Sequence, residues 1–122
     1  MIDHIGVTVT DFARSVAFYE KALAPLGYTV HMKGEGFAGF AFGGKPDFWI
    51  GVGGSAQRVH VAFRAKGRAD VRAFYEAAVA AGGKDNGAPG VREMYHPDYY
   101  GAFVLDPDGH NIEAVCHEPY LG

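Results

Sequence analysis

Three residues of the chain have side chains that could together bind a divalent metal ion: His4, His60 and Glu113. Two imidazoles and a carboxylate are a ligand set used by non-haem iron and by other octahedral divalent ions, with coordination positions left open for a substrate. The three residues lie far apart in the sequence, so a shared site requires a fold that carries all of them to one surface.

An internal repeat predicts such a fold. With an offset of 56 residues, HIGVTVTDFARSVAFYEKALAPLGY (4–28) lies over HVAFRAKGRADVRAFYEAAVAAGGK (60–84). His4 then matches His60, and AFYE occurs in both copies, at 17–20 and 73–76. We interpret the match as a duplication, which gives the two histidines equivalent positions.

Each copy is expected to begin with a strand and a helix. In DHIGVTVT the apolar Ile5, Val7 and Val9 occupy alternate positions, which is the period of a half-buried strand. A helix is expected from about Asp11, and the second copy repeats the plan with the strand RVHVAFR and a helix from about Asp70.

Three further strands are expected after each helix. They are YTVHMK, FAGFAF and DFWIGV in the first copy, and VREMY, YGAFVL and NIEAVC in the second. The turn DPDGH suits a tight hairpin, because proline pre-sets one backbone angle and glycine accepts a left-handed conformation. The predicted fold class is therefore α+β, one domain over 1–122 with a βαβββ module at about 1–54 and another at about 57–118.

Strand alternation predicts that the candidate ligands share one face. His4 lies on the face opposite Ile5, Val7 and Val9, and His60 has the equivalent place in the second copy. Glu113 stands between two apolar residues, and an ionised carboxylate does not face an apolar core without compensation. We therefore expect both histidines and Glu113 on the concave side of the sheet.

Four other residues are candidates for contacts near this site. Tyr100 could donate a hydrogen bond to a developing oxyanion, or could simply be a core or rim aromatic. Trp49 is either a pocket wall or a packing residue, His96 a substrate or supporting contact, and Arg92 an anion contact or an exposed arginine. The last two belong to the segment 84–98, which we expect to be a loop that shapes substrate choice.

The remaining candidates are expected to be structural. His110 is expected to belong to the hairpin, on the face opposite Glu113, and His31 and His117 read as exposed strand-edge or tail residues. Cys116, the one cysteine, is expected to be a small buried side chain.

Composition excludes several classes of partner. A net charge of −3 offers no basic patch for nucleic acid, and no apolar run approaches the roughly 20 residues that span a bilayer. The first residues lack the pattern of a secretory signal, and a single cysteine cannot form an internal disulfide. We therefore expect a cytoplasmic protein that acts on a small molecule.

The chain resembles the vicinal oxygen chelate superfamily, which includes glyoxalase I, extradiol dioxygenases and the bleomycin and fosfomycin resistance proteins. The resemblance rests on DHIGVTVTDFARSVAFYEKAL, on VHVAF and on YYGAFVLDPDGHNIEAV. It implies paired βαβββ modules that form a curved, cup-like mixed sheet with helices on the outside. It also implies His4, His60 and Glu113 as ligands of a divalent ion, which would be Fe, Mn, Zn or Ni.

The resemblance implies chemistry by bidentate chelation of a small oxygenated substrate, of the isomerase/lyase, thiol transferase or ring-cleaving dioxygenase type. The alternative is a metal-free protein that sequesters a ligand, as the bleomycin resistance members do. Some members take a fourth ligand from the last strand of the first module, which matching of the hairpins places at Gly51 or Val52, where no ligand exists. A homodimer is expected, in which exchange of modules could let each site draw on two chains.

Overall fold

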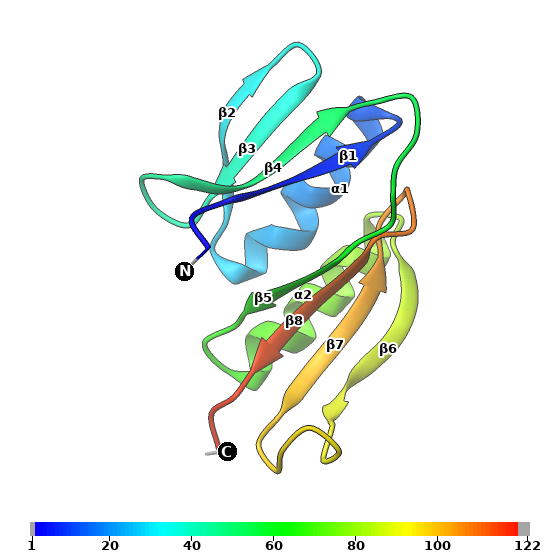
Figure 1. The fold of residues 1–122 in the computed structure, drawn as a ribbon. Helices are drawn as coiled ribbons and strands as arrows, with labels where there is room; N and C mark the ends of the chain where they lie inside the picture. Colours follow the sequence, from blue (N-terminus) through cyan, green and yellow to red (C-terminus); the bar gives the residue numbers. More distant parts are fainter. Residues whose placement is uncertain (1, 120–122) are drawn as a thin grey trace.

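Two four-stranded sheets, each backed by one helix, make up residues 2–119, which are the part of the chain described by the computed structural model (Figure 1). The first module contains β1 (Ile5–Val9), α1 (Phe12–Leu23), a short 3₁₀ turn (Ala24–Leu26), β2 (Thr29–Gly34), β3 (Phe37–Ala41) and β4 (Pro46–Val52). The second contains β5 (His60–Arg64), α2 (Arg68–Ala80), β6 (Lys84–Val91), β7 (Tyr100–Leu105) and β8 (Asn111–Cys116). The predicted α+β class with two βαβββ modules is confirmed.

The two sheets have the same topology. Their strand orders are β1-β4-β3-β2 and β5-β8-β7-β6. The first strand of each module runs parallel to the last, and the other neighbours are antiparallel. A strand joined to its parallel neighbour needs a long connection, which the helix and two intervening strands provide. The repeat in the sequence is thus a repeat in the structure.

The helices begin and end where local chemistry allows. The side chain of Asp11 accepts a hydrogen bond from the backbone N–H of Arg14 at 3.2 Å, which caps the start of α1. After the 3₁₀ turn, Gly27 takes a left-handed conformation with φ of 90°. That conformation ends the helical segment at low cost because glycine has no Cβ.

The core lies between the helices and the inner faces of the sheets. Val7 and Val9 are buried there, as strand alternation predicts, beneath α1. A cluster of aromatic rings joins the two modules, with Phe48 from β4 packed edge-to-face on Phe63 from β5 at a centroid distance of 5.2 Å. α1 and α2 also contact each other behind the sheets, so no helix of the described part of the chain covers the outer face of either sheet (Figure 1).

The prediction for segment 84–98 is wrong in part. Lys84–Val91 forms β6, and the expected strand VREMY is instead mostly loop. β6 is an edge strand whose register shifts twice along β7. Glycines and a proline suggest a loop in the sequence, but an edge strand with bulges tolerates both. Within residues 2–119, neither helix has the length and apolarity to cross a membrane.

Candidate functional site

His60 and Glu113 form a close pair on the outer face of the second sheet. β5 and β8 are parallel neighbours with Ala62 opposite Glu113, which brings the two side chains to the same surface. The distance from His60 Nε2 to Glu113 Oε1 is 3.0 Å. The Glu113 side chain is only 2% exposed, whereas that of His60 is 49% exposed. A buried carboxylate therefore lies beneath a solvent-facing imidazole.

Hydrogen bonding fixes which nitrogen of His60 faces Glu113. His60 Nδ1 lies 3.0 Å from the carbonyl oxygen of Asn111, and a carbonyl accepts only from a protonated nitrogen. In the neutral imidazole, Nε2 then presents a lone pair toward the carboxylate. Two acceptors at this distance repel each other unless a proton or a cation lies between them. A backbone carbonyl that orients the opposite nitrogen is also a common support for a metal-binding histidine.

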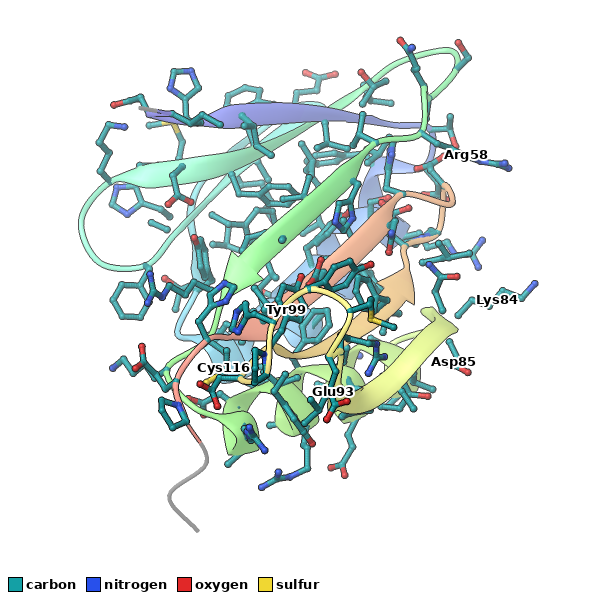
Figure 2. The ribbon with its side chains drawn as sticks, turned by 60° about the horizontal axis from the view of Figure 1, so that its bottom comes forward. Arg58, Lys84, Asp85, Glu93, Tyr99 and Cys116 are labelled. Carbon is teal, nitrogen blue, oxygen red and sulfur yellow. The ribbon has the colours of Figure 1, made fainter. Side chains whose placement is uncertain are left out.

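Tyr99 holds the second oxygen of the carboxylate. It lies in the loop between β6 and β7, which passes over the second sheet (Figure 2). Its hydroxyl donates a hydrogen bond to Glu113 Oε2. Burial, and next the hydrogen bond and the charge of Glu113, raise the pKa of Tyr99 well above its ordinary value. Gly101 makes room for this contact, because a Cβ there would lie 3.2 Å from the Tyr99 ring and 3.3 Å from Glu113 Oε2.

Tyr100 lies on the other face of β7 from Glu113. Tyr100 packs against the core, and the guanidinium of Arg68 lies 4.9 Å from its ring centroid. It is the neighbour of Gly101, whose position is next to Glu113, and alternation along β7 therefore directs Tyr100 to the opposite face. Tyr99 and Tyr100 are neighbours in the sequence and both have a hydroxyl group. Because side chains alternate along β7, only that of Tyr99 points toward Glu113.

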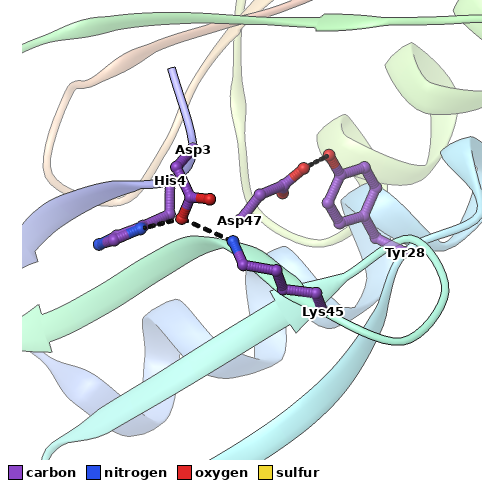
Figure 3. A network of polar contacts seen from close by, with 5 residues as sticks. All are labelled: Asp3, His4, Tyr28, Lys45 and Asp47. Carbon is purple, nitrogen blue, oxygen red and sulfur yellow. Dashed lines mark hydrogen bonds and ion pairs between the residues drawn. The ribbon is translucent and has the colours of Figure 1, made fainter. Parts of the chain in front are cut away.

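His4 is exposed at the beginning of β1 and lies outside this pair. Its Nδ1 is 2.7 Å from Asp3 Oδ1, which also accepts from Lys45 Nζ at 2.6 Å (Figure 3). The hydrogen bond from Lys45, followed by that from His4, lowers the pKa of Asp3. His4 and His60 both line a cavity of about 390 Å³ between the modules, but Glu113 does not. The two predicted ligands of the second module are thus together, and His4 of the same chain does not join them within residues 2–119.

Arg92 and His96 lie on the loop side of the same face. The guanidinium of Arg92 lies 5.5 Å from the ring centroid of Phe103, which is opposite Glu113 on β7. His96 Nε2 is 2.9 Å from Nδ1 of His117, and the ring of His96 contacts Tyr99. His117 is an exposed residue that follows β8, as expected, and it also contacts His96 and Tyr99 of this loop.

A second group of possible metal ligands lies at the turn between β7 and β8. Donor atoms of Asp106, Asp108 and His110 lie within 4.8 Å of one another, so these residues could hold a metal ion. The sequence predicts the turn but not this group of possible ligands. The pattern that could have indicated the group is two acids and a histidine within five residues.

Hydrogen bonds occupy both nitrogens of His110. Nδ1 accepts from the backbone N–H of Val59 at 3.1 Å, and Nε2 lies 2.8 Å from the carbonyl oxygen of Thr8. His110 is fully buried between these partners. In this arrangement Nε2 carries the proton and neither nitrogen is free for a metal.

The two acids of this turn are also engaged. Asp106 accepts from the Tyr19 hydroxyl at 2.5 Å, and Asp108 accepts from the Thr10 hydroxyl at 2.5 Å. These contacts join the turn of the second module to β1 and α1 of the first. The group therefore acts as a clasp between the modules, and we use this name below for Asp106, Asp108 and His110.

Comparison with known proteins identifies the family. Residues 1–114 match the family described as the Glyoxalase/Bleomycin resistance protein/Dioxygenase superfamily. The chain belongs to this superfamily. No curated protein matches the chain.

Several solved structures share the superfamily fold. A glyoxalase/bleomycin resistance protein from Albidiferax ferrireducens T118 is 28% identical, with a TM-score of 0.81 over 96% of this chain and 98% of that one. A glyoxalase/bleomycin resistance protein/dioxygenase family enzyme from Burkholderia phytofirmans PsJN is 19% identical, with a TM-score of 0.74 over 96% and 98%. A glyoxalase I mutant from Zea mays is 20% identical, with a TM-score of 0.70 over 98% of this chain and 45% of that one.

Strand register identifies the residue of the first module that corresponds to Glu113. Ala62 is opposite Glu113, and its repeat counterpart Gly6 is opposite Trp49. The counterpart is therefore Trp49. The placement at Gly51 or Val52 is wrong, because the hairpins pair Gly39 with Trp49 and Phe103 with Glu113, ten residues apart in each module. Neither position supplies a ligand, so the first module of this superfamily member offers His4 and an indole.

Trp49 lies on the outer face of the first sheet beside His4. Its ring covers Gly39, where a Cβ would lie only 2.7 Å from the indole. Together with His4, Gly6 and Lys45 it lines a cavity of about 590 Å³. The wall role suggested for Trp49 is thus consistent with its position. Trp49 and His4 thus lie on a different sheet from His60 and Glu113.

The donor chemistry of this superfamily member fits a divalent ion. His60 supplies an imidazole whose other nitrogen is bound to a carbonyl, and Glu113 supplies a carboxylate held by Tyr99. Such supported nitrogen and oxygen donors suit Fe, Mn, Zn or Ni. Two donors leave a site that needs at least one more protein ligand.

Proposed function

We propose that this protein is a metal-dependent enzyme that binds a small oxygenated substrate through two neighbouring oxygens. His60 and Glu113 bind the metal, and His4 is the third protein ligand. The observation that carries the proposal is the 3.0 Å approach of His60 Nε2 to Glu113 Oε1, with Nδ1 held by the Asn111 carbonyl. Without a proton or a cation, this approach is unfavourable.

The third ligand comes from a second copy of the chain. His4 and Trp49 lie on an outer sheet face that no helix covers, and His60 and Glu113 lie on the equivalent face of the other sheet. Two copies related by a twofold axis can place the first half-site of one against the second half-site of the other, twice. This supports a homodimer with sites shared between chains.

The residues of the chain prepare the site for chelation. The Asn111 carbonyl keeps the proton of His60 on Nδ1, and the Tyr99 hydroxyl orients the Glu113 carboxylate. Tyr99 keeps its own proton, since its pKa is raised, and so acts as a donor. A metal ion bound here would act as a Lewis acid on substrate oxygens. This chemistry serves isomerase/lyase, thiol transferase and ring-cleaving dioxygenase reactions alike.

Metal analysis of matched variants tests the proposal. The protein is purified without chelators, loaded with Fe, Mn, Zn or Ni and assayed for bound metal. We expect about one ion per chain in the wild type, and at least a tenfold loss of metal affinity in Glu113→Gln. Asp108→Asn is the matched control because it alters the other possible metal group. Loss of metal in Asp108→Asn, with retention in Glu113→Gln, would contradict the proposal.

A metal-free binding protein is the second candidate. Exposed aromatic side chains on the first sheet favour it, since Phe37 is 42% exposed and its ring lies 6.4 Å from that of Trp49. A flat ligand could stack there without a metal. Failure of wild-type protein to bind any of the four metals would favour this function.

A further inference from the structure

We infer that the substrate carries an oxyanion group, a carboxylate or a phosphonate, and that Arg92 binds it beside the His60–Glu113 pair. The inference rests on the proposed function, because it places the chelated end of the substrate at that pair. It adds a substrate class and a second anchor point.

Strand register places Arg92 at a fixed position relative to Glu113. Ala62, Glu113, Phe103 and Gly87 form one row across β5, β8, β7 and β6. Gly87 is thus two strand spacings from Glu113, which is about 10 Å. The guanidinium of Arg92 lies on this part of β6, because a Cβ on Gly87 would be 3.2 Å from its Nη2 and one on Gly90 would be 3.0 Å from its Nη1.

Two glycines of β6 leave space for the guanidinium of Arg92. A side chain at Gly87 or Gly90 would contact the guanidinium of Arg92. Because both residues are glycines, the guanidinium can lie against the backbone of β6. Arg92 Nη2 donates to the carbonyl oxygen of Ala88 at 2.8 Å, which fixes the orientation of the group. One hydrogen bond uses one of five guanidinium N–H groups.

The charge of Arg92 is not matched by an acid. Among residues 2–119, no carboxylate forms an ion pair with this arginine, although its side chain is partly buried. A partly buried arginine with spare donors is suited to bidentate binding of an oxyanion.

Phe103 sets the size of the substrate. Its ring contacts the imidazole of His60 at a centroid distance of 6.2 Å and the guanidinium of Arg92 at 5.5 Å. A ligand that contacts both the His60–Glu113 pair and Arg92 must lie over the ring of Phe103. A small acid with two oxygens near one end and its anionic group a few bonds away meets this requirement.

Calorimetric binding of three probes tests the inference. The probes are 2-oxoglutarate and phosphonoacetate, which are anions, and dimethyl 2-oxoglutarate, a neutral ester. Wild type, Arg92→Gln, Arg92→Lys and Arg14→Gln are compared, each with its metal content measured. Arg14 is an exposed residue of α1 and serves as the control for loss of one positive charge.

We expect wild type to bind at least one anion tenfold or more tighter than the ester. Arg92→Gln should lose about 10- to 100-fold of this affinity, Arg92→Lys less, and Arg14→Gln none, all with unchanged metal content. Equal or absent binding of the anions by wild type, or a preference that survives in Arg92→Gln, would overturn the inference. Anion binding that depends on Arg92 in protein that takes up no metal would instead refute only the proposed metal function.

Discussion

Glu113 shows how one acidic residue can be buried at low cost. Its Oε2 accepts a hydrogen bond from Tyr99, and its Oε1 lies 3.0 Å from His60 Nε2, a contact that a bound proton or cation makes favourable. Strand alternation in the sequence predicts the face on which Glu113 lies. It does not predict the burial, because the cover comes from a loop that reaches the site only after β6 and β7 pair.

The ionisation of Tyr99 is expected to report on Glu113. Because the folded pKa is raised, the contribution of Tyr99 to stability is present below its ordinary pKa of 10.0 and is lost as the pH rises through the folded value. Glu113→Gln removes the charge and weakens the hydrogen bond. We expect one additional tyrosine to titrate closer to 10 in that variant, as measured by phenolate absorbance in an alkaline titration.

Two further variants test whether the change in the tyrosine titration comes from Tyr99. Glu118→Gln removes an exposed acid that pairs with Arg64, and should leave the tyrosine titration unaltered. Adding Tyr99→Phe to Glu113→Gln should remove the additional tyrosine. An identical titration curve for wild type and Glu113→Gln would show that Glu113 does not control Tyr99.

At the scale of elements, the turn between β7 and β8 joins the modules. The clasp contacts Thr8 and Thr10 at the end of β1 and Tyr19 on α1. DPDGH predicts a tight turn because of its own residues. It does not predict that the same side chains bind another module, since those partners are about 90 to 100 residues away.

Tyr19→Phe is expected to destabilise the fold. The variant leaves Asp106 Oδ2, a buried acceptor, without its hydroxyl donor. A loss of about 1–3 kcal/mol in the free energy of unfolding follows from an unsatisfied buried polar group. Urea unfolding at neutral pH measures the change.

Tyr28→Phe provides a matched comparison. The Tyr28 hydroxyl donates to Asp47 at 3.1 Å in a partly exposed place, where water can replace it (Figure 3). We expect a loss of about 1 kcal/mol or less. A Tyr28 effect equal to that of Tyr19 would argue against a special role of the clasp.

At the scale of the whole molecule, the two half-sites lie on separate sheets. His4 and Trp49 belong to the first, and His60 and Glu113 to the second. Each sheet has an outer face without a helix, so association of two chains is the simplest way to oppose them. The proposed shared site depends on this association.

Mixing two defective variants tests the shared site. His4→Ala and Glu113→Ala each lose metal binding if both residues are ligands. In a mixed dimer with sites shared between chains, one site receives His4 and Glu113 from different chains and is intact. Unfolding and refolding an equal mixture should therefore restore about a quarter of wild-type metal binding, measured after gel filtration of the dimer.

Sites formed within one chain would give no recovery on mixing. Refolded wild type and each refolded variant alone serve as controls for the procedure. A dimer that forms from the mixture without recovery of metal would contradict the shared site, and a wild-type protein that elutes as a monomer would contradict it as well.

The sequence alone determined the duplicated modules and the faces of their first strands. These follow from local periodicity and from similarity between two segments, both of which are read without knowledge of distant contacts. His4, His60 and Glu113 were selected in this way, and the side of the sheet expected for His60 and Glu113 agrees with their positions.

The tertiary structure decided what meets Glu113. It brought Tyr99 rather than Tyr100 to Glu113, placed Trp49 opposite Gly6, and made Lys84–Val91 a strand that leads directly into Arg92. Each of these outcomes depends on pairing register between strands. Register is set by bulges and hairpin lengths across the whole sheet, and a shift of one residue moves a side chain to the other face.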